Sequence, residues 1–177
     1  MCIRDRAPRA NEEPFCVDMA PTYAPWNKIL DYKEKGLDLE KDIAIDINGE
    51  TTLNPNEARA LLPIAGYKGY ALAALVEVLC STLSGMNFGP HIPSMYGTSI
   101  KESRKLGQLY ILMRTDVNVG IDEFTENLHK MSKEIREQES KNNNSVLVPN
   151  DPQIIESKKR LKNGIPVSQE IYGLLID

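Results

Sequence analysis

The stretch that decides the fold reads Leu61-Leu62-Pro63-Ile64-Ala65-Gly66-Tyr67-Lys68-Gly69-Tyr70. It places a lysine between two glycines, directly before residues 71–86, where apolar side chains recur with helical spacing. Glu77 is the only formally charged residue of that segment, so we expect a helix that is buried on most sides. A helix N-terminus carries partial positive charge, and a lysine beside it suits a bound anion that glycines allow to approach. Spacing alone leaves a second interpretation equally open, in which the lysine faces solvent and the glycines only form a tight turn.

Composition indicates one compact domain with a proper core, since 41% of the 177 residues are hydrophobic and 26% are charged. The net charge of −4 argues against nucleic acid or an anionic membrane as a general partner. Polar residues interrupt the longest apolar stretch, residues 71–88, which we therefore interpret as a buried helix rather than a membrane span. Cys2, Cys16 and Cys80 lack metal-ligand spacing and predict a reduced, cytoplasmic protein without a structural metal.

Hydrophobic periodicity predicts strands alternating with helices, which indicates an α/β or α+β fold. No Gly-x-Gly-x-x-Gly occurs, so a Rossmann site has no support. The predicted strands cover residues 15–18 and 108–113, the second of them buried, and the predicted helices cover residues 21–35, 54–61, 71–86, 121–135 and 151–163, with a polar loop at 138–144.

Several collinear motifs resemble the type-2 malate/L-lactate dehydrogenase family. The stretch quoted above resembles the family's most recognisable segment, and the resemblance runs from about Ala7 to the C-terminus. The other motifs are residues 14–20 (Pro-Phe-Cys-Val-Asp-Met-Ala), 46–55 (Asp-x-x-Gly-x-x-Thr-x-x-Pro), 146–151 (Val-Leu-Val-Pro-Asn-Asp) and 164–167 (Gly-Ile-Pro-Val).

This resemblance implies an NAD-dependent 2-hydroxy-acid oxidoreductase, with NADP as the alternative cofactor. It also implies a mixed sheet with helices in a non-Rossmann NAD-binding fold, and a homodimer for the full-length protein. The cofactor residues implied are Asp18, Met19 and Ala20, which would line the cofactor cleft, and Lys68 on the phosphate or ribose side, with Gly66 and Gly69 allowing close approach. For Asp18, a helix N-cap is the alternative role.

Residues 94–96 (Ser-Met-Tyr) and 103–109 (Ser-Arg-Lys-Leu-Gly-Gln-Leu) resemble the ureidoglycolate dehydrogenase branch of the family. That branch oxidises ureidoglycolate to oxalurate in purine catabolism, and a malate- or lactate-type activity is the alternative. Arg104 would then pair with a substrate carboxylate, because a guanidinium fork suits one, although an ordinary surface arginine is the competing interpretation.

The chain departs from the family pattern at Pro21, usually threonine, and at Asn27, Ala71 and Asn150, usually glycine. Pro21 removes a backbone N–H beside the expected cofactor but suits the first turn of a helix.

We interpret residues 1–6 as a non-native leader and residues 7–177 as the C-terminal part of a dehydrogenase that is truncated at its N-terminus. The family's catalytic histidine would then lie upstream, so we assign no catalytic residue. By motif, His91 is expected in a loop and His129 on the solvated side of a helix. An inactive remnant without that histidine is the remaining alternative.

Overall fold

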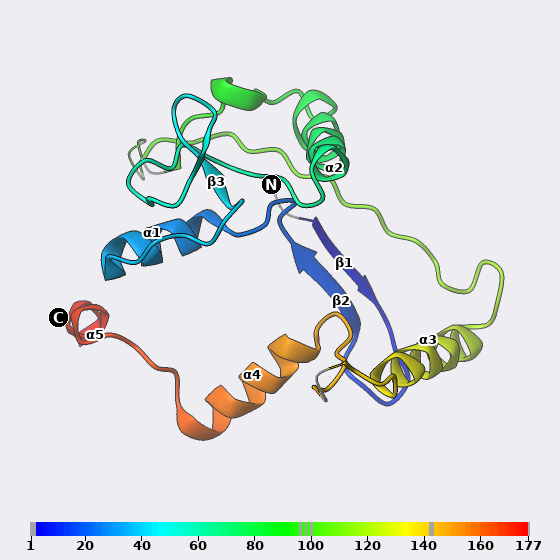
Figure 1. The fold of residues 1–177 in the computed structure, drawn as a ribbon. Coiled ribbons are helices and arrows are strands. Elements are labelled where there is room, and N and C mark those ends of the chain that lie inside the picture. The colour runs from blue at the N-terminus through cyan, green and yellow to red at the C-terminus, as the bar shows by residue number, and fades with distance from the viewer. Residues whose placement is uncertain (1–2, 96, 98, 100, 142–143, 177) are drawn as a thin grey trace. The chain divides into compact units, whose positions relative to one another are not determined.

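The computed structural model describes residues 3–95, 97, 99, 101–141 and 144–176, with Glu170 and Leu174 described for the backbone only. Figure 1 shows the helices and strands along the chain. The chain divides into two compact units, which are described separately: unit 1 comprises Met1–Arg4 and Asp18–Met113, and unit 2 comprises Asp5–Val17 and Arg114–Asp177. Strands β1 (Ile3–Ala7) and β2 (Phe15–Met19) form a two-stranded sheet, and the division falls within both strands. The strand predicted at residues 15–18 is confirmed.

Unit 1 contains a small antiparallel sheet of β3 (Ala44–Ile45), β4 (Thr51–Thr52) and β5 (Ala60–Leu61), in the order β4-β3-β5. Ala44 is paired with Thr52 on one side and with Leu61 on the other. The helix predicted at residues 54–61 is therefore wrong. Asn54 instead accepts the N–H of Asn56 with its side chain, over 3.0 Å, in a turn. After this turn the chain pairs with the sheet instead of forming a helix, and the backbone N–H of Arg59 donates to the carbonyl of Ile45 over 2.8 Å.

Helix α1 (Trp26–Lys35) begins five residues later than predicted, because Thr22 pairs with Pro63 in a β-bridge and Pro25 is the N-cap of the helix. Its end is as predicted, with Gly36 at φ 64°, a left-handed conformation that glycine adopts without cost. The helix buries Ile29. The hydrophobic core of unit 1 comprises Ala24, Ile29, Leu39, Ile43, Ala44 and Ala58, with Trp26, Tyr32 and Leu61 packed against it.

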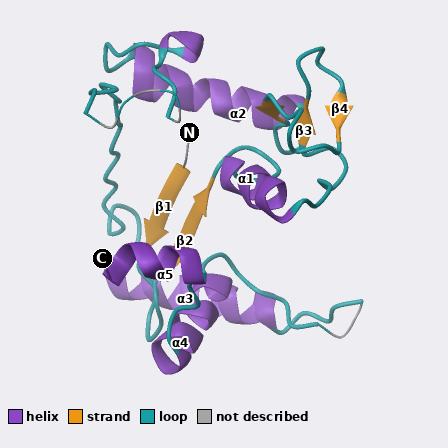
Figure 2. Cartoon of the chain, turned by 90° about the vertical axis from the view of Figure 1, so that its left-hand side faces the viewer, coloured by secondary structure: helices purple, strands orange, loops and turns teal. Residues whose placement is uncertain are grey.

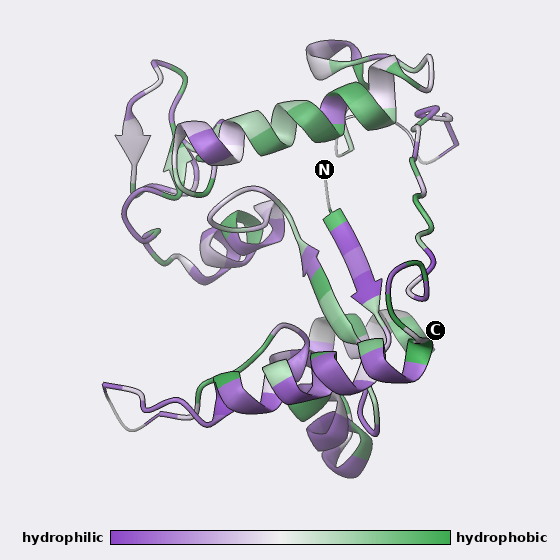
Figure 3. Ribbon diagram, turned by 90° about the vertical axis from the view of Figure 1, so that its right-hand side faces the viewer, coloured by the Kyte–Doolittle hydropathy of each residue, from purple (hydrophilic) through white to green (hydrophobic). Residues whose placement is uncertain are grey.

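The long apolar helix is formed by α2 (Tyr67–Glu77) and its π-helical continuation η1 (Val78–Thr82). The helix predicted at residues 71–86 is present but begins at Tyr67 and ends at Thr82, and the prediction that it is buried on most sides is wrong. Within α2 only Gly69 and Val76 are buried, while Leu75 is 53% and Tyr67 is 78% exposed. Figure 3 shows much of this helix in green, the colour of hydrophobic residues, and its buried and half-buried residues lie mainly on one side of it. In the described part of the chain, no helix is long and apolar enough to cross a membrane.

Residues 108–113 do not form the buried strand that their apolar sequence predicted. They have no regular secondary structure, and Leu112 is 93% and Met113 is 83% exposed. A strand requires a neighbour that accepts and donates its ladder hydrogen bonds, and no backbone hydrogen bond joins this segment to another described residue. The prediction failed because β-propensity does not supply the partner.

Unit 2 contains α3 (Ile121–Arg136), α4 (Asp151–Asn163) and α5 (Gln169–Ile176) (Figure 2). The helices predicted at residues 121–135 and 151–163 are confirmed, and Gly164 follows α4 at φ 83°. Helix α5 was not predicted. The polar loop is free of helix and strand where it is described, and Asn142 and Asn143 lie outside the described residues.

Gly69→Ala is expected to destabilise unit 1. A Cβ atom on Gly69 would lie 2.0 Å from the carbonyl oxygen of Ile64 and 2.9 Å from its carbonyl carbon. A backbone group cannot rotate away as a side chain can, so we expect the free energy of unfolding to fall by about 1–3 kcal/mol. Gly120→Ala is the control, because the corresponding Cβ meets nothing within 4 Å and φ is −60°. Urea unfolding that finds equal stability for both variants would contradict this packing.

Candidate functional site

Backbone pairing in unit 1 brings two of the sequence motifs together. Thr22 forms an antiparallel bridge with Pro63, the N–H of Tyr23 donates to the carbonyl of Leu62 over 3.1 Å, and that of Ile64 donates to the carbonyl of Pro21 over 3.2 Å. The Asp-Met-Ala motif ends directly before the first segment, and the glycine–lysine motif begins directly after the second. Because the segments are antiparallel, the two motifs meet at the same end of the pair.

Pro21 lies in this extended pair and not in the first turn of a helix, which corrects the sequence interpretation. It is buried, and its carbonyl accepts the N–H of Ile64. Only the carbonyl of this residue takes part in the pairing described, so proline is compatible with the position that threonine usually occupies in the family.

Gly66 and Lys68 form the start of α2. Gly66 is the N-cap, at φ 60° and ψ −124°, a conformation that residues with a Cβ rarely adopt. Lys68 lies in the first turn, where there is no acidic residue, and its exposed side chain has no ion-pair partner in the part of the chain that the structure describes. An unpaired ammonium group therefore adds to the positive end of a helix dipole, which is the electrostatic requirement for binding an anion.

The two glycines beside Lys68 differ in the room that they leave. A Cβ on Gly66 would meet nothing within 4 Å, whereas the space beside Gly69 is filled by the backbone of Ile64. Gly66 is thus the glycine that leaves space for a ligand. Gly69 holds α2 against the extended segment before it and so fixes where the helix begins.

Asp18 and Met19 end strand β2, and half-buried Ala20 follows them. The Asp18 carboxylate accepts hydrogen bonds from the Nε and Nη2 atoms of Arg4, which belongs to the segment interpreted above as a leader. Met19 is 37% exposed. The N-cap interpretation of Asp18 is wrong for α1, whose N-cap is Pro25.

The Asp-x-x-Gly-x-x-Thr motif at residues 46–52 builds the turn between β3 and β4. The Asp46 carboxylate accepts the backbone N–H groups of Asn48 over 2.8 Å and Glu50 over 3.0 Å. These bonds, that to Glu50 foremost, hold the pKa of Asp46 below its usual range. Gly49 provides a positive φ of 85°, and the hydroxyl of Thr52 accepts the N–H of Asn54. This motif therefore specifies a turn, and no ligand is needed to explain it.

Arg104 lies at a cavity of about 470 Å³ in unit 1. Its Nε donates to the carbonyl of Pro93 over 2.9 Å, and the side chain is half-buried. The neighbouring Tyr96 of the Ser-Met-Tyr motif lies outside the described residues. The residues around the cavity are Ser84, Gly85, Met86, Asn87, Pro93, Ser103, Arg104, Lys105, Leu106 and Gly107.

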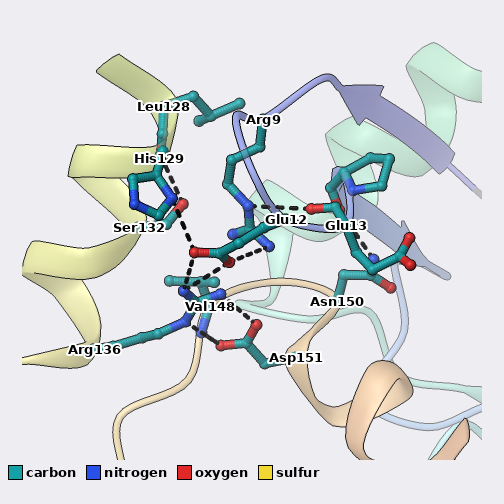
Figure 4. A network of polar contacts seen from close by, with 11 residues as sticks. Arg9, Glu12, Glu13, Leu128, His129, Ser132, Arg136, Val148, Asn150 and Asp151 are labelled. Atoms are coloured by element: carbon teal, nitrogen blue, oxygen red, sulfur yellow. Dashed lines mark hydrogen bonds and ion pairs between the residues drawn. The ribbon is translucent and has the colours of Figure 1, made fainter. Parts of the chain in front are cut away.

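Unit 2 contains a polar network that the sequence did not predict (Figure 4). The guanidinium of Arg136 donates from Nε and Nη2 to the two carboxylate oxygens of Asp151, each over 2.8 Å, and its Nη1 lies 2.9 Å from Glu12. Glu12 also lies 2.9 Å from Nδ1 of His129. The expectation that His129 is solvated is therefore wrong, because its side chain is 30% exposed and contacts a carboxylate. His91, by contrast, lies exposed in the short 3₁₀ turn η2 (Gly89–His91).

The network is better explained by structure than by catalysis. The bidentate bond from Arg136 holds the pKa of Asp151 below its usual range, and Asp151 raises the pKa of Arg136. Both groups stay charged and satisfy each other. Asn150, where the family has glycine, adopts φ 83° and donates from its side chain to the carbonyl of Pro14 over 3.0 Å. Asparagine tolerates this left-handed conformation better than most residues, which explains the substitution. No group of three His, Cys, Asp or Glu side chains that could hold a metal ion occurs among the described residues.

Comparison with known proteins places this geometry in context. The sequence model of the malate/L-lactate dehydrogenase family matches residues 6–175. Ureidoglycolate dehydrogenase (NAD(+)) of Escherichia coli strain K12 is 33% identical over 171 residues, which cover 96% of this chain and 49% of the relative. Malate/(S)-sulfolactate dehydrogenase of Methanothermus fervidus is 32% identical over 168 residues, covering 94% of this chain and 48% of that protein.

Solved structures agree on the fold. Sulfolactate dehydrogenase from Methanocaldococcus jannaschii superposes with a TM-score of 0.81 at 28% identity, covering 97% of this chain and 49% of that one. Malate dehydrogenase from Entamoeba histolytica gives a TM-score of 0.84 at 21% identity, covering 96% and 51%, and supports the fold alone. This chain spans about half the length of the relatives that it matches. The mixed α/β fold and the resemblance inferred from the motifs are both confirmed, and the chain belongs to the malate/L-lactate dehydrogenase family.

Proposed function

We propose that this chain carries the cofactor-binding part of an NAD-dependent 2-hydroxy-acid dehydrogenase whose substrate is ureidoglycolate, oxidised to oxalurate. The observation that carries the proposal is the pairing of Thr22 with Pro63, which joins the Asp-Met-Ala motif to the start of α2. The E. coli relative, named for ureidoglycolate and NAD(+), supports the choice of substrate and cofactor.

The start of α2 fits a dinucleotide phosphate. Lys68 would form a charge-assisted hydrogen bond with a phosphate oxygen, and Gly66 would let the phosphate approach the backbone. Asp18, Met19 and Ala20 would line the adjoining wall, where the exposed Met19 offers an apolar surface. Bound NAD supplies the hydride acceptor, and the protein supplies binding, orientation and electrostatics.

A malate- or sulfolactate-type substrate is the second candidate. The M. fervidus protein is 32% identical, close to the 33% of the ureidoglycolate dehydrogenase, so identity alone does not separate these substrates. The pairing of Thr22 with Pro63 supports both candidates equally, because the start of α2 is proposed to bind the cofactor and not the substrate.

We assign neither histidine of the chain as the proton acceptor. His91 lies in the turn η2, and His129 belongs to the network of unit 2. We therefore expect the 177-residue chain to produce no NADH from ureidoglycolate, because a 2-hydroxy acid must lose its hydroxyl proton as hydride leaves. The family histidine is proposed to lie outside this chain. NADH production by the chain alone, followed at the absorbance of NADH, would contradict this proposal.

Substrate choice can be tested in a chimera that joins residues 7–177 to the remaining half of the E. coli relative. We expect its kcat/KM for ureidoglycolate to exceed the values for malate and sulfolactate by at least about tenfold, a difference that one well-placed polar contact can produce. Equal or faster turnover of malate would instead assign the chain to the malate-type branch.

A further inference from the structure

The cavity beside Arg104 combines two cationic side chains with hydrogen-bonding groups, and none of the described residues in its wall is acidic. Arg104 and Lys105 provide the positive charge, Ser103 provides a hydroxyl group, and Asn87 provides an amide. Uncompensated positive charge in a concave site of about 470 Å³ favours an anionic ligand.

One hydrogen bond holds the side chain of Arg104 in place and leaves its other N–H groups unused by the described residues. Its Nε is committed to the carbonyl of Pro93, which fixes the plane of the half-buried guanidinium. Its two Nη groups have no hydrogen-bond or ion-pair partner among the residues for which the structure gives contacts. A planar guanidinium whose two Nη groups are both unoccupied can bind the oxygens of a carboxylate or a phosphate.

The backbone around Arg104 is constrained as well. Lys105 has φ 47°, in the left-handed region that a lysine rarely adopts. A Cβ on Gly107 would lie 2.1 Å from the carbonyl oxygen of Cys80 and 2.2 Å from the hydroxyl of Ser84, so this segment fits tightly against the end of η1. Strain of this kind persists where the surrounding structure holds it, and it is concentrated at functional sites.

Compensation of a helix dipole is the competing explanation, because cations stabilise helix C-termini and η1 ends at Thr82. The carbonyls of Cys80 and Ser81 at this end, however, already accept hydrogen bonds. The hydroxyl of Ser84 donates to the carbonyls of Cys80 and Ser81, and the N–H of Met86 also donates to that of Ser81. Arg104 donates to Pro93 instead, so capping does not account for its position.

The cavity is also separate from the anion site at Lys68. Lys68 lies in the first turn of the α2–η1 helix and Ser84 lies just beyond its last turn, sixteen residues later, which at 1.5 Å per residue separates them by roughly 24 Å. A 2-hydroxy acid is too short to contact both. Two anions could therefore occupy the cavity. One is a phosphate on the adenosine ribose of the cofactor, and the other is the acidic group of a substrate bound beside the nicotinamide.

We propose that the Arg104–Lys105 cavity is a second anion subsite, which receives an oxyanion of the cofactor or of the substrate. This inference rests on the proposed function. The sequence suggested only that Arg104 contacts a substrate carboxylate, whereas the proposal here is a defined site in which Lys105 is the second cation.

Isothermal titration of the 177-residue chain with inorganic phosphate tests the subsite. We expect Arg104→Met to raise the Kd for phosphate about tenfold, as loss of a charge-assisted hydrogen bond predicts, and Arg104→Lys to restore part of the affinity. Arg59→Met is the matched control, because Arg59 is an exposed arginine of the same unit that does not line this cavity. Thermal melts without phosphate report whether each variant folds.

The same variants distinguish the source of the anion. If NADP binds the wild type more tightly than NAD and Arg104→Met removes the difference, the anion is the cofactor's ribose phosphate. If NAD and NADP bind equally and oxalurate or malate loses affinity in Arg104→Met, the anion belongs to the substrate. Equal phosphate affinity in the wild type and Arg104→Met overturns the subsite. Failure of the wild type to bind NADH, with phosphate binding still dependent on Arg104, would overturn the proposed function and leave the subsite standing.

Discussion

Asp151→Ala is expected to lower the free energy of unfolding of unit 2 by about 2–4 kcal/mol, somewhat less than breaking a fully buried ion pair. The Asp151 side chain is 10% exposed and accepts two hydrogen bonds from Arg136 and one, over 3.0 Å, from the N–H of Val148. Alanine would leave the guanidinium of Arg136, itself 27% exposed, with Glu12 as its remaining partner. It would also remove an acidic group from the first turn of α4.

The chain offers a closely matched control in Asp116→Ala. Asp116 accepts the same bidentate pair of hydrogen bonds from Arg114, over 2.9 and 2.8 Å. The side chain of Asp116 is, however, 44% exposed and that of Arg114 is 80% exposed. Exposed ion pairs contribute little to stability, so Asp116→Ala should be nearly neutral. Urea unfolding of the two variants measures the effect of burial at constant chemistry, and equal losses would contradict the role assigned to the network.

The pH dependence of this difference has a definite sign. Arg136 holds the pKa of Asp151 below its ordinary value of 3.8, so the carboxylate binds protons less readily in the folded state. Its contribution is therefore fully present above the unfolded pKa and is lost as the pH falls through the folded pKa. The stability difference between wild type and Asp151→Ala should stay constant above about pH 5 and shrink below about pH 4. A difference that grew on acidification would contradict this assignment.

Features that depend on neighbouring residues in the sequence could be predicted. The ends of α1 and α4 follow from Gly36 and Gly164, each in a conformation with positive φ that terminates a helix. Helix α3 follows from an apolar stripe and from Asp122 and Glu123 in its first turn. In these cases the signal and the structure that it specifies lie within a few turns of one another.

Features that depend on distant partners could not be predicted. Residues 54–61 carry a helix-start signal, yet the N–H of Arg59 is used by Ile45 in the sheet. Residues 108–113 have strand propensity but no described partner strand. The polar sequence around His129 gave no sign of Glu12, which lies at the other end of the chain. Each of these errors concerns a long-range partner, present or missing, that local preference does not specify.

The candidate site combines both kinds of information. The local sequence indicated that glycines flank Lys68 next to an apolar helix, but the helix begins at Tyr67 rather than at the predicted residue 71, so Lys68 lies within its first turn. The placement of the Asp-Met-Ala motif beside the glycine–lysine motif could not be obtained in this way, because it depends on the bridge between Thr22 and Pro63. Resemblance to the family had assigned both motifs to the cofactor, and that assignment stays a prediction.

Lys68→Ala is expected to weaken NADH binding by roughly ten- to a hundredfold, which corresponds to the loss of one charge-assisted hydrogen bond to phosphate. Folding should change little, because the Lys68 side chain is exposed and makes no described hydrogen bond or ion pair. Lys68→Arg should recover only part of the affinity, since a planar guanidinium does not reproduce a compact ammonium at a helix start.

Lys101→Ala provides the control for charge, because Lys101 is an exposed lysine of the same unit that does not belong to α2. Fluorescence titration of NADH against the wild type and the three variants, with thermal melts alongside, separates loss of binding from loss of folding. Equal weakening by Lys101→Ala would show that NADH responds only to net charge. Unchanged affinity in Lys68→Ala would make this lysine an ordinary surface residue, and the start of α2 would then serve only to build the fold.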